Sequence, residues 1–414
     1  MKEKLSSLAE PSLFRGIWRG MRALAANTLR EELRSRTFLV YVVLFLVFMG
    51  VYRVGFGNEQ RIGVARFLDY AYSGMSALLL LAAAFTAISF KQPGRLGGAT
   101  TEEVRRTLGA AAWFWGRLCG VVLALVALAF VLGAIVIIHY MARFGDAKGE
   151  IVQLRDRYLS TSFESASHPI FVRDVGDEVE LDFAMPAGNL AGLEATFSPR
   201  LAVMKEGGGV RSSYPVGIRV FDPDRLDGGL DQSLVVHLHR GKSRRFSVDL
   251  EGVPRPDRLK VVVRKIHAEY LIRMQREDLE LIGRERSFFA NLLEAALMVA
   301  LYASVLAALL QFIAGYLPWG VSLLAALGLL VLASSYSVVE LGLLHEWSPF
   351  WRLATLEGAK AILPDFGDYD AATHLSRGRA VGGRLLASLV LRVLGTGFLA
   401  GLVNGFLDRR RARS

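Results

Sequence analysis

The sequence predicts a polytopic α-helical membrane protein with six transmembrane helices and an inserted extracytoplasmic β-sandwich domain. The 414 residues are 52% hydrophobic and only 21% charged, and the mean hydropathy is +0.35. This composition is too apolar for an ordinary soluble protein of this size. Apolar runs also stand on both sides of one long polar stretch that has a different periodicity. Together these two observations predict a membrane bundle interrupted by a separate domain.

Six apolar windows are long enough to be transmembrane helices. A bilayer core of about 30 Å requires roughly 20 apolar residues in a helix, because lipid offers the backbone no hydrogen-bond partners. The windows are Thr37–Val54, which is the weakest, Ala71–Phe90, Ala112–Met141, Phe288–Tyr316, Pro318–Leu344 and Val381–Leu407. The sequence therefore predicts three parts: residues 1–141 with the first three spans, residues 142–286 as the inserted domain, and residues 287–414 with the last three spans and a basic tail.

Basic residues at both ends of the chain indicate that both termini are cytoplasmic. The lysines and arginines before the first window and in the tail are Lys2, Lys4, Arg15, Arg19, Arg22, Arg30, Arg34, Arg36, Arg409, Arg410, Arg411 and Arg413. Cytoplasmic segments of membrane proteins are enriched in such residues. Six crossings then place the loop Lys91–Ala111 inside and the long insert outside. We expect a multi-pass protein of the cytoplasmic (inner) membrane of a prokaryote, whose basic surplus faces the lipid bilayer and not nucleic acid.

The segment before the first window has the pattern of an amphipathic helix. Leu13, Ile17, Met21 and Leu24 recur at helical spacing, and arginines occupy the other faces. The pattern predicts an interfacial helix along the inner leaflet. The alternative is a cytoplasmic helix that packs on a partner.

The insert alternates with a period of two, which is typical of half-buried strands. The alternating apolar positions include Val179, Leu181 and Phe183; Val216, Ile218 and Val220; Leu234, Val236 and Leu238; Phe246, Val248 and Leu250; and Leu259, Val261 and Val263. Glycine and proline turn signals separate these runs. About seven or eight strands in an antiparallel sandwich are expected.

The motifs of catalysis and of cofactor or metal binding are missing from the sequence. Gly241-Lys242-Ser243 resembles the end of a phosphate-binding loop, but Val236 stands where that motif requires glycine. His345-Glu346 begins like a zinc-protease motif, but Pro349 replaces the second histidine. The single cysteine, Cys119, permits no intrachain disulfide. We therefore expect no enzyme activity in the chain itself, no cofactor and no metal site.

Ionisable residues inside the predicted spans are candidates for a functional charge network. Each costs roughly 2.5 to 3.5 kcal/mol at a helix centre unless it is paired or hydrated. Glu294, Glu340 and Arg392 are the main candidates, and all three are expected toward the outer leaflet. Two acidic side chains around one arginine would lower the desolvation cost of each. The alternative is that the side chains snorkel to the membrane interface.

The loop between the second and third spans contains a predicted cytoplasmic helix. Thr100 followed by Glu103 forms a capping-box pattern. Glu102 and Glu103 would lie at the positive end of this helix, with Arg105 and Arg106 further along. A short charged helix between two spans is suited to docking on a partner, whereas the alternative is a solvated loop helix.

The order of these parts resembles the ABC-2 type transporter permeases. The resemblance covers about two thirds of the chain: an amphipathic entry helix, two spans, the loop TTEEVRRTLGAAAWFWGRL, a third span, and three more spans with LPDFGDYDAATHLSRGRAV before the last. It implies a half-transporter that pairs with a separate ABC ATP-binding subunit, as a homodimer or with a homologous permease. The helix at Thr101–Leu108 would then dock in a groove of the ATPase.

The β-rich insert departs from many members of this family. Its placement is similar to that of the extracytoplasmic domain in lipopolysaccharide-export permeases, which makes a lipid, a lipoprotein or another amphiphile a conceivable substrate. The alternative function is a non-transporting, membrane-anchored binding or signalling protein whose sandwich binds a ligand or an envelope partner.

Overall fold

The computed structural model divides the chain into two compact units. The helical unit comprises Met1–Val152 and Phe288–Ser414, and the β unit comprises Gln153–Ser287. The structure describes residues 11–55, 63–88, 95–96, 99–100, 108–144, 155–159, 170–184, 194–197, 200–202, 214–224, 230–238, 244–247, 258–267, 270–274, 279–285, 287–318, 320–331, 366, 369–376 and 378–411.

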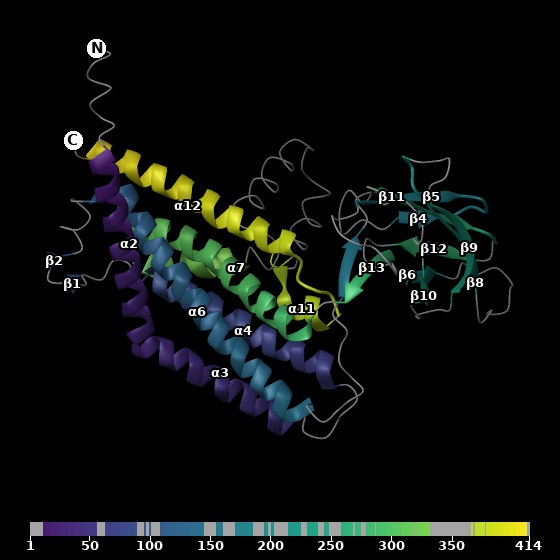
Figure 1. Cartoon of the computed structure of the whole chain (residues 1–414), viewed down its shortest axis with the longest axis horizontal. Helices are drawn as coiled ribbons and strands as arrows, with labels where there is room; N and C mark the ends of the chain where they lie inside the picture. The colour runs from purple at the N-terminus through teal and green to yellow at the C-terminus, as the bar shows by residue number, and fades with distance from the viewer. Residues whose placement is uncertain are drawn as a thin grey trace, which may run out of the picture. The chain divides into compact units, whose positions relative to one another are not determined.

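Long helices build the helical unit (Figure 1). They are α2 (Pro11–Arg34), α3 (Arg36–Gly55), α4 (Gly63–Ile88), α6 (Ala110–Phe144), α7 (Phe288–Tyr316) and α12 (Gly383–Arg411), with the short α11 (Ala371–Ser376) before the last. In the described part of the chain, α4, α6, α7 and α12 are each long and apolar enough to cross a membrane. The helices α2 and α3 meet at a 50° bend and add a fifth candidate when taken as one span. The protein is therefore a multi-pass membrane protein with four or five candidate spans.

These spans agree in part with the six predicted windows. The windows that begin at Ala71, Ala112, Phe288 and Val381 coincide with α4, α6, α7 and α12. The first window corresponds to α3, which the structure joins to α2 through the bend. Of the window Pro318–Leu344, a shorter apolar helix spans Gly320–Val331, and the rest lies outside the described residues.

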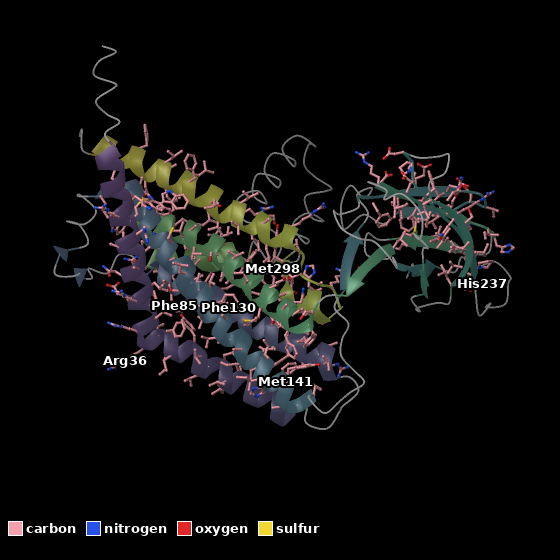
Figure 2. All side chains as sticks on the ribbon, viewed as in Figure 1. Arg36, Phe85, Phe130, Met141, His237 and Met298 are labelled. Carbon is pink, nitrogen blue, oxygen red and sulfur yellow. The ribbon has the colours of Figure 1, made fainter. Side chains whose placement is uncertain are left out.

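Large apolar side chains are exposed on the described helices of this unit, and small side chains are frequent on the buried helix α7. Phe85, Phe130 and Met141 are between 41% and 52% exposed, and Met298 is fully buried (Figure 2). The helix α7 packs against α4, α6 and α12, and its buried side chains include many alanines. Small residues let helix backbones approach closely, and this approach stabilises helix pairs where lipid removes the hydrophobic driving force.

Aromatic side chains cluster at both ends of α6. Tyr140 and Phe144 at its C-terminal end contact Phe67 of α4, and Tyr140 also contacts Phe288 of α7. Trp113 lies in its first turn. The 27 residues from Trp113 to Tyr140 span about 40 Å of helix, which matches the 40–45 Å thickness of a bilayer with its head groups. Aromatic residues are enriched at both membrane interfaces, and the spacing of Trp113 and Tyr140 along α6 fits this pattern.

The β unit is built from short antiparallel strands. They are β3 (Arg155–Leu159), β4 (Ile170–Val172), β5 (Glu178–Ala184), β6 (Glu194–Phe197), β7 (Arg200–Ala202), β8 (Tyr214–Phe221), β9 (Asp231–Leu238), β10 (Arg244–Ser247), β11 (Arg258–Lys265), β12 (Leu271–Met274) and β13 (Leu279–Glu285). Their order is β5-β11-β8-β9 in one sheet, β10-β6-β13-β3 in a second and β4-β12-β7 in a third. The described residues thus form eleven strands, more than expected, because strands of three or four residues are too short to show alternation.

The predicted alternation is confirmed in the sheet β5-β11-β8-β9. Leu181 and Phe183 of β5, Ile218 of β8 and Val261 of β11 are buried, and their neighbours in sequence are more exposed, except that Val262 of β11 is also buried. The same core includes Ile272 of β12. It also includes Leu279 of β13, so all three sheets contribute to one hydrophobic core.

Candidate functional site

The structure describes only part of the residues that the sequence singled out. Glu102, Glu103, Arg105, Arg106 and Glu340 lie outside the described residues. Glu294 is on α7 and Arg392 is on α12, and both are partly buried. The amide Nδ2 of Asn291, one turn before Glu294, donates a hydrogen bond of 3.2 Å to its carboxylate.

Two hydrogen bonds fix the register of α12 along α7. The backbone N–H of Val381 donates to Asn291 Oδ1 over 3.1 Å, and the hydroxyl of Tyr316 donates to Asn404 Oδ1. A residue of α7 thus lies level with the residue 88 to 90 positions later in the sequence, which is in α12 or just before it. On this register Arg392 is level with Tyr302 to Ser304. Glu294 lies eight to ten residues from that level, which is about 12 to 15 Å along the helix axis.

The last residue of the predicted docking helix, Leu108, is among the described residues. Leu108 is helical, and Gly109 has φ = +80°, the conformation that commonly ends a helix because glycine adopts it without a Cβ clash. The next helix, α6, begins with a bond from Trp113 N–H to the carbonyl of Gly109. On the other side, Thr100 pairs with Arg95 in the two-stranded hairpin of β1 (Arg95–Leu96) and β2 (Ala99–Thr100).

Leu24, one of the four residues of the apolar stripe predicted for this segment, lies on the side of α2 that packs against α6. Leu24 is 3% exposed and forms a cluster with Trp113 and Leu108. A Cβ built on Gly120 would lie 2.5 Å from Thr28 Cβ and 2.8 Å from the carbonyl of Ala25. At Gly116 it would lie 3.0 Å from the carbonyl of Met21. Gly116 and Gly120 are four residues apart, the spacing that allows close helix contact in membranes.

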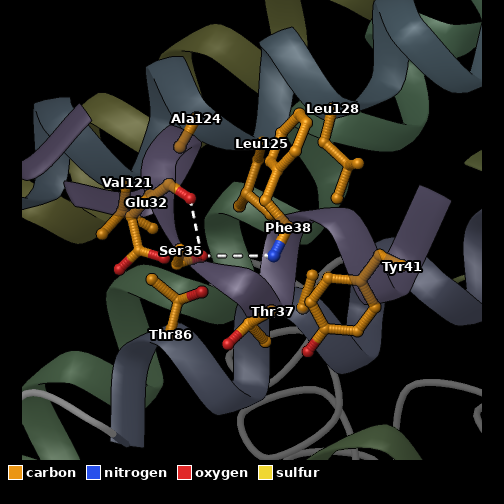
Figure 3. A pocket seen from close by; sticks show the side chains of 11 residues that line it. Glu32, Ser35, Thr37, Phe38, Tyr41, Thr86, Val121, Ala124, Leu125 and Leu128 are labelled. Atoms are coloured by element: carbon orange, nitrogen blue, oxygen red, sulfur yellow. Dashed lines mark hydrogen bonds between the residues drawn. The ribbon is translucent and has the colours of Figure 1, made fainter. Parts of the chain in front are cut away.

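The bend between α2 and α3 is held by Ser35. Its Oγ donates a hydrogen bond of 2.7 Å to the carbonyl of Glu32 and accepts one of 3.1 Å from the N–H of Phe38 (Figure 3). The first bond satisfies a carbonyl at the end of α2. The second caps the start of α3 in the manner typical of serine at a helix N-terminus.

A pocket opens beside this bend, between α3, α4 and α6 (Figure 3). We call it the elbow pocket. Polar groups line one side, and the aliphatic side chains of α6 line the other. Its residues are Glu32, Ser35, Thr37, Phe38, Tyr41, Ala82, Thr86, Val121, Ala124, Leu125 and Leu128. The pocket is open on one side, and its enclosed part has room for a group about the size of one water molecule.

Oppositely charged residues of α2 and α6 interact electrostatically. Arg117 is partly buried on α6 and is attracted by Glu32, which lines the elbow pocket, and, less strongly, by Glu31. None of these residues belongs to a motif that the sequence predicts. Arg117 carried a usable signal, because it is an arginine inside the predicted span Ala112–Met141. Its acidic neighbours carried none, since they are more than 80 residues away and precede the first predicted window.

Among the described residues, no group of three or more His, Cys, Asp or Glu side chains is placed to hold a metal ion. The carboxylate and hydroxyl groups that line the elbow pocket offer electrostatic and hydrogen-bonding interactions. No protein-family model matches the chain, and no curated protein matches it at a significant level.

Proposed function

We propose that the chain is the transmembrane permease subunit of an ATP-driven ABC exporter. A separate ATP-binding subunit would supply the energy, and two permease chains, identical or homologous, would form the membrane pathway. Both termini would lie in the cytoplasm of a prokaryote, with the β unit outside the inner membrane. The substrate class we propose is a lipid, a lipoprotein or another amphiphile.

The observation that carries this proposal is the contact made by Leu108. This residue ends the segment that is predicted to dock on the ATPase, and it packs with Leu24 of α2 and Trp113 of α6. The contact with α2 is close, because a Cβ on Gly20 would lie 2.3 Å from Leu108 Cδ2. A displacement of the docking segment would therefore move two packed helices together. Such a rigid linkage is what a half-transporter driven by a separate ATPase requires.

The pairing with an ATPase is tested by purification from native membranes. The charge-reversed variant Glu102→Lys/Glu103→Lys should recover much less ATPase than the wild-type chain, because it opposes an electrostatic contact. The matched control is Glu3→Lys/Glu10→Lys, which makes the same change of charge near the N-terminus. Equal recovery of the ATPase with both variants would contradict docking through this loop.

A second variant tests transmission separately from docking. Leu108→Ala removes the contact with α2 and α6 and leaves the charged docking residues intact. We expect it to bind the ATPase normally in proteoliposomes but to lose most of the coupling between ATP hydrolysis and substrate export. The control is Leu33→Ala, which truncates an exposed leucine of α2. Absence of any associated ATPase in the wild-type preparation would favour the non-transporting alternative.

A further inference from the structure

We propose that the elbow pocket binds the ammonium head group and the first methylene groups of an amine-bearing amphiphile from the membrane. The proposal concerns binding alone and does not depend on ATP-driven transport. It rests on the pocket's lining, on the charges beside it and on its depth along α6.

The lining of the pocket is divided between hydrogen-bond acceptors and hydrocarbon. The carboxylate of Glu32 and the hydroxyls of Thr37, Tyr41 and Thr86 line it together with the α6 side chains Leu125 and Leu128. An ammonium group has three donors and no acceptor, so it complements a carboxylate surrounded by hydroxyl oxygens. The leucines suit the methylene groups that follow such a head group.

The partly buried carboxylate of Glu32 favours a cation. It lines the pocket and is attracted by the guanidinium of Arg117, which does not itself line the pocket. The nearby Glu31, Arg34 and Arg36 are exposed and do not line the pocket either. A bound ammonium group beside Glu32 would lower the cost of keeping its carboxylate out of water, because an opposite charge offsets the lost hydration.

The depth of the pocket favours an amphiphile over a soluble amine. The α6 residues of the pocket, Val121 to Leu128, lie 8 to 15 residues beyond Trp113, which corresponds to about 12 to 22 Å along the helix. If Trp113 marks the membrane interface, the pocket lies within the hydrocarbon core. A soluble amine would have to leave water to reach it, whereas a membrane amphiphile already supplies its chain to this depth.

Binding is tested with three probes that share a 12-carbon chain: dodecylamine, dodecanol and dodecanoate. The purified full-length protein is titrated in phosphatidylcholine nanodiscs at pH 7, and thermal stabilisation is measured. We expect dodecylamine alone to stabilise the protein. In Glu32→Gln its affinity should fall at least about tenfold, the change expected for loss of one charge-assisted hydrogen bond.

The matched control is Glu31→Gln, which makes the same change of charge at an exposed position on the same helix. It should change the affinity for dodecylamine by no more than about twofold, because an exposed charge contributes little. Thr86→Val, which removes a hydroxyl from the pocket on α4, provides a second test and should also weaken dodecylamine binding if Glu32→Gln does not fold. Equal binding of all three probes, or equal loss in Glu31→Gln and Glu32→Gln, would overturn the proposal.

Lipid mass spectrometry of the protein purified from membranes identifies the natural source of the ammonium group. Enrichment of an aminolipid in the wild-type protein but not in Glu32→Gln would indicate a resident membrane lipid. A wild-type protein that lacks such enrichment but binds dodecylamine through Glu32 would indicate a transient amphiphile. Binding of dodecylamine that survives both Glu32→Gln and Thr86→Val would contradict the site.

Discussion

The hydroxyl of Tyr72 in α4 donates a hydrogen bond of 2.6 Å to the backbone carbonyl of Leu292 in α7. Both residues are fully buried, so no water can replace the bond. We expect Tyr72→Phe to lower the free energy of unfolding by about 0.5 to 1.5 kcal/mol. The control is Tyr70→Phe, because Tyr70 makes a longer bond of 3.2 Å to the carbonyl of Phe48 in a less buried position. Thermal unfolding in detergent measures both, and a larger loss at Tyr70 would contradict this ranking.

The close contact between α2 and α6 predicts that Gly120 tolerates no side chain. In Gly120→Ala the new methyl group meets Thr28 and the backbone of Ala25, so α2 must move away from α6. We expect a destabilisation of about 1 to 3 kcal/mol, typical of overpacking. A Cβ at Gly50 of α3 meets nothing within 4 Å, so Gly50→Ala should be neutral or should stabilise the helix by up to about 1 kcal/mol. Thermal unfolding in detergent compares the two variants, and similar effects on stability would contradict the close packing of α2 against α6 at Gly120.

The register between α7 and α12 sharpens the expectation for the predicted charge network. Arg392 lies level with Tyr302 to Ser304, too far along the axis for an easy ion pair with Glu294. A double-mutant cycle of Arg392→Leu and Glu294→Gln should therefore give a coupling energy within about 0.5 kcal/mol of zero. The parallel cycle with Glu340→Gln tests the other predicted partner and should give the larger coupling. Strong coupling to Glu294 would show that the two helices shift from this register.

The β unit is expected to fold as a separate soluble protein. It has its own hydrophobic core, to which residues of all three sheets contribute, and domains with their own core usually fold alone. Residues 142–286 should therefore give a circular dichroism spectrum dominated by β-structure. A mainly helical or disordered spectrum would show that the unit depends on the rest of the chain.

An ion pair on the β unit predicts a specific pH dependence. Arg219 donates two hydrogen bonds, of 2.8 and 2.7 Å, to the two carboxylate oxygens of Asp231. These bonds lower the pKa of Asp231 below its ordinary value. Because the folded-state pKa is the lower one, the pair's stabilisation is present above the unfolded pKa of about 3.9 and is lost as the pH falls through the folded pKa.

Replacement of Arg219 by glutamine should raise the pKa of Asp231 toward about 3.9, and an NMR titration of the Asp231 carboxyl measures the change. Lys260→Gln provides the control, since Lys260 pairs with Glu180 and should leave Asp231 unchanged. Both members of the Arg219–Asp231 pair are about half exposed, so the effect on overall stability should be small. An unchanged pKa in Arg219→Gln would refute the ion pair.

The strands of the β unit were the most predictable feature of the fold. Each run such as Val216, Ile218 and Val220 shows its buried face directly in the sequence, because side chains alternate between the two faces of a sheet. The order of the strands could not be derived in the same way. The partners Leu181 and Val261 are 80 residues apart, and no local pattern identifies which strands pair.

Hydropathy predicted where the long helices lie, but it did not predict what their faces contact. Leu24 belongs to an apolar stripe that would suit either lipid or another helix, and the structure places it against Trp113 of α6. The elbow pocket was missed for a related reason. Glu32 comes close to α6 only because α2 packs along that helix, and neither Glu32 nor Arg117 belongs to a recognisable motif.

The first and last strands of the β unit are hydrogen-bonded partners, with Arg155 of β3 opposite Glu285 of β13. The sheet that contains them therefore closes only after the end of the insert has been synthesised. The chain consequently enters and leaves this unit at neighbouring points, which is the arrangement that lets one domain be spliced into a loop of another. The insert is thus suited to be gained, lost or exchanged as one unit in the segment that joins the helices α6 and α7.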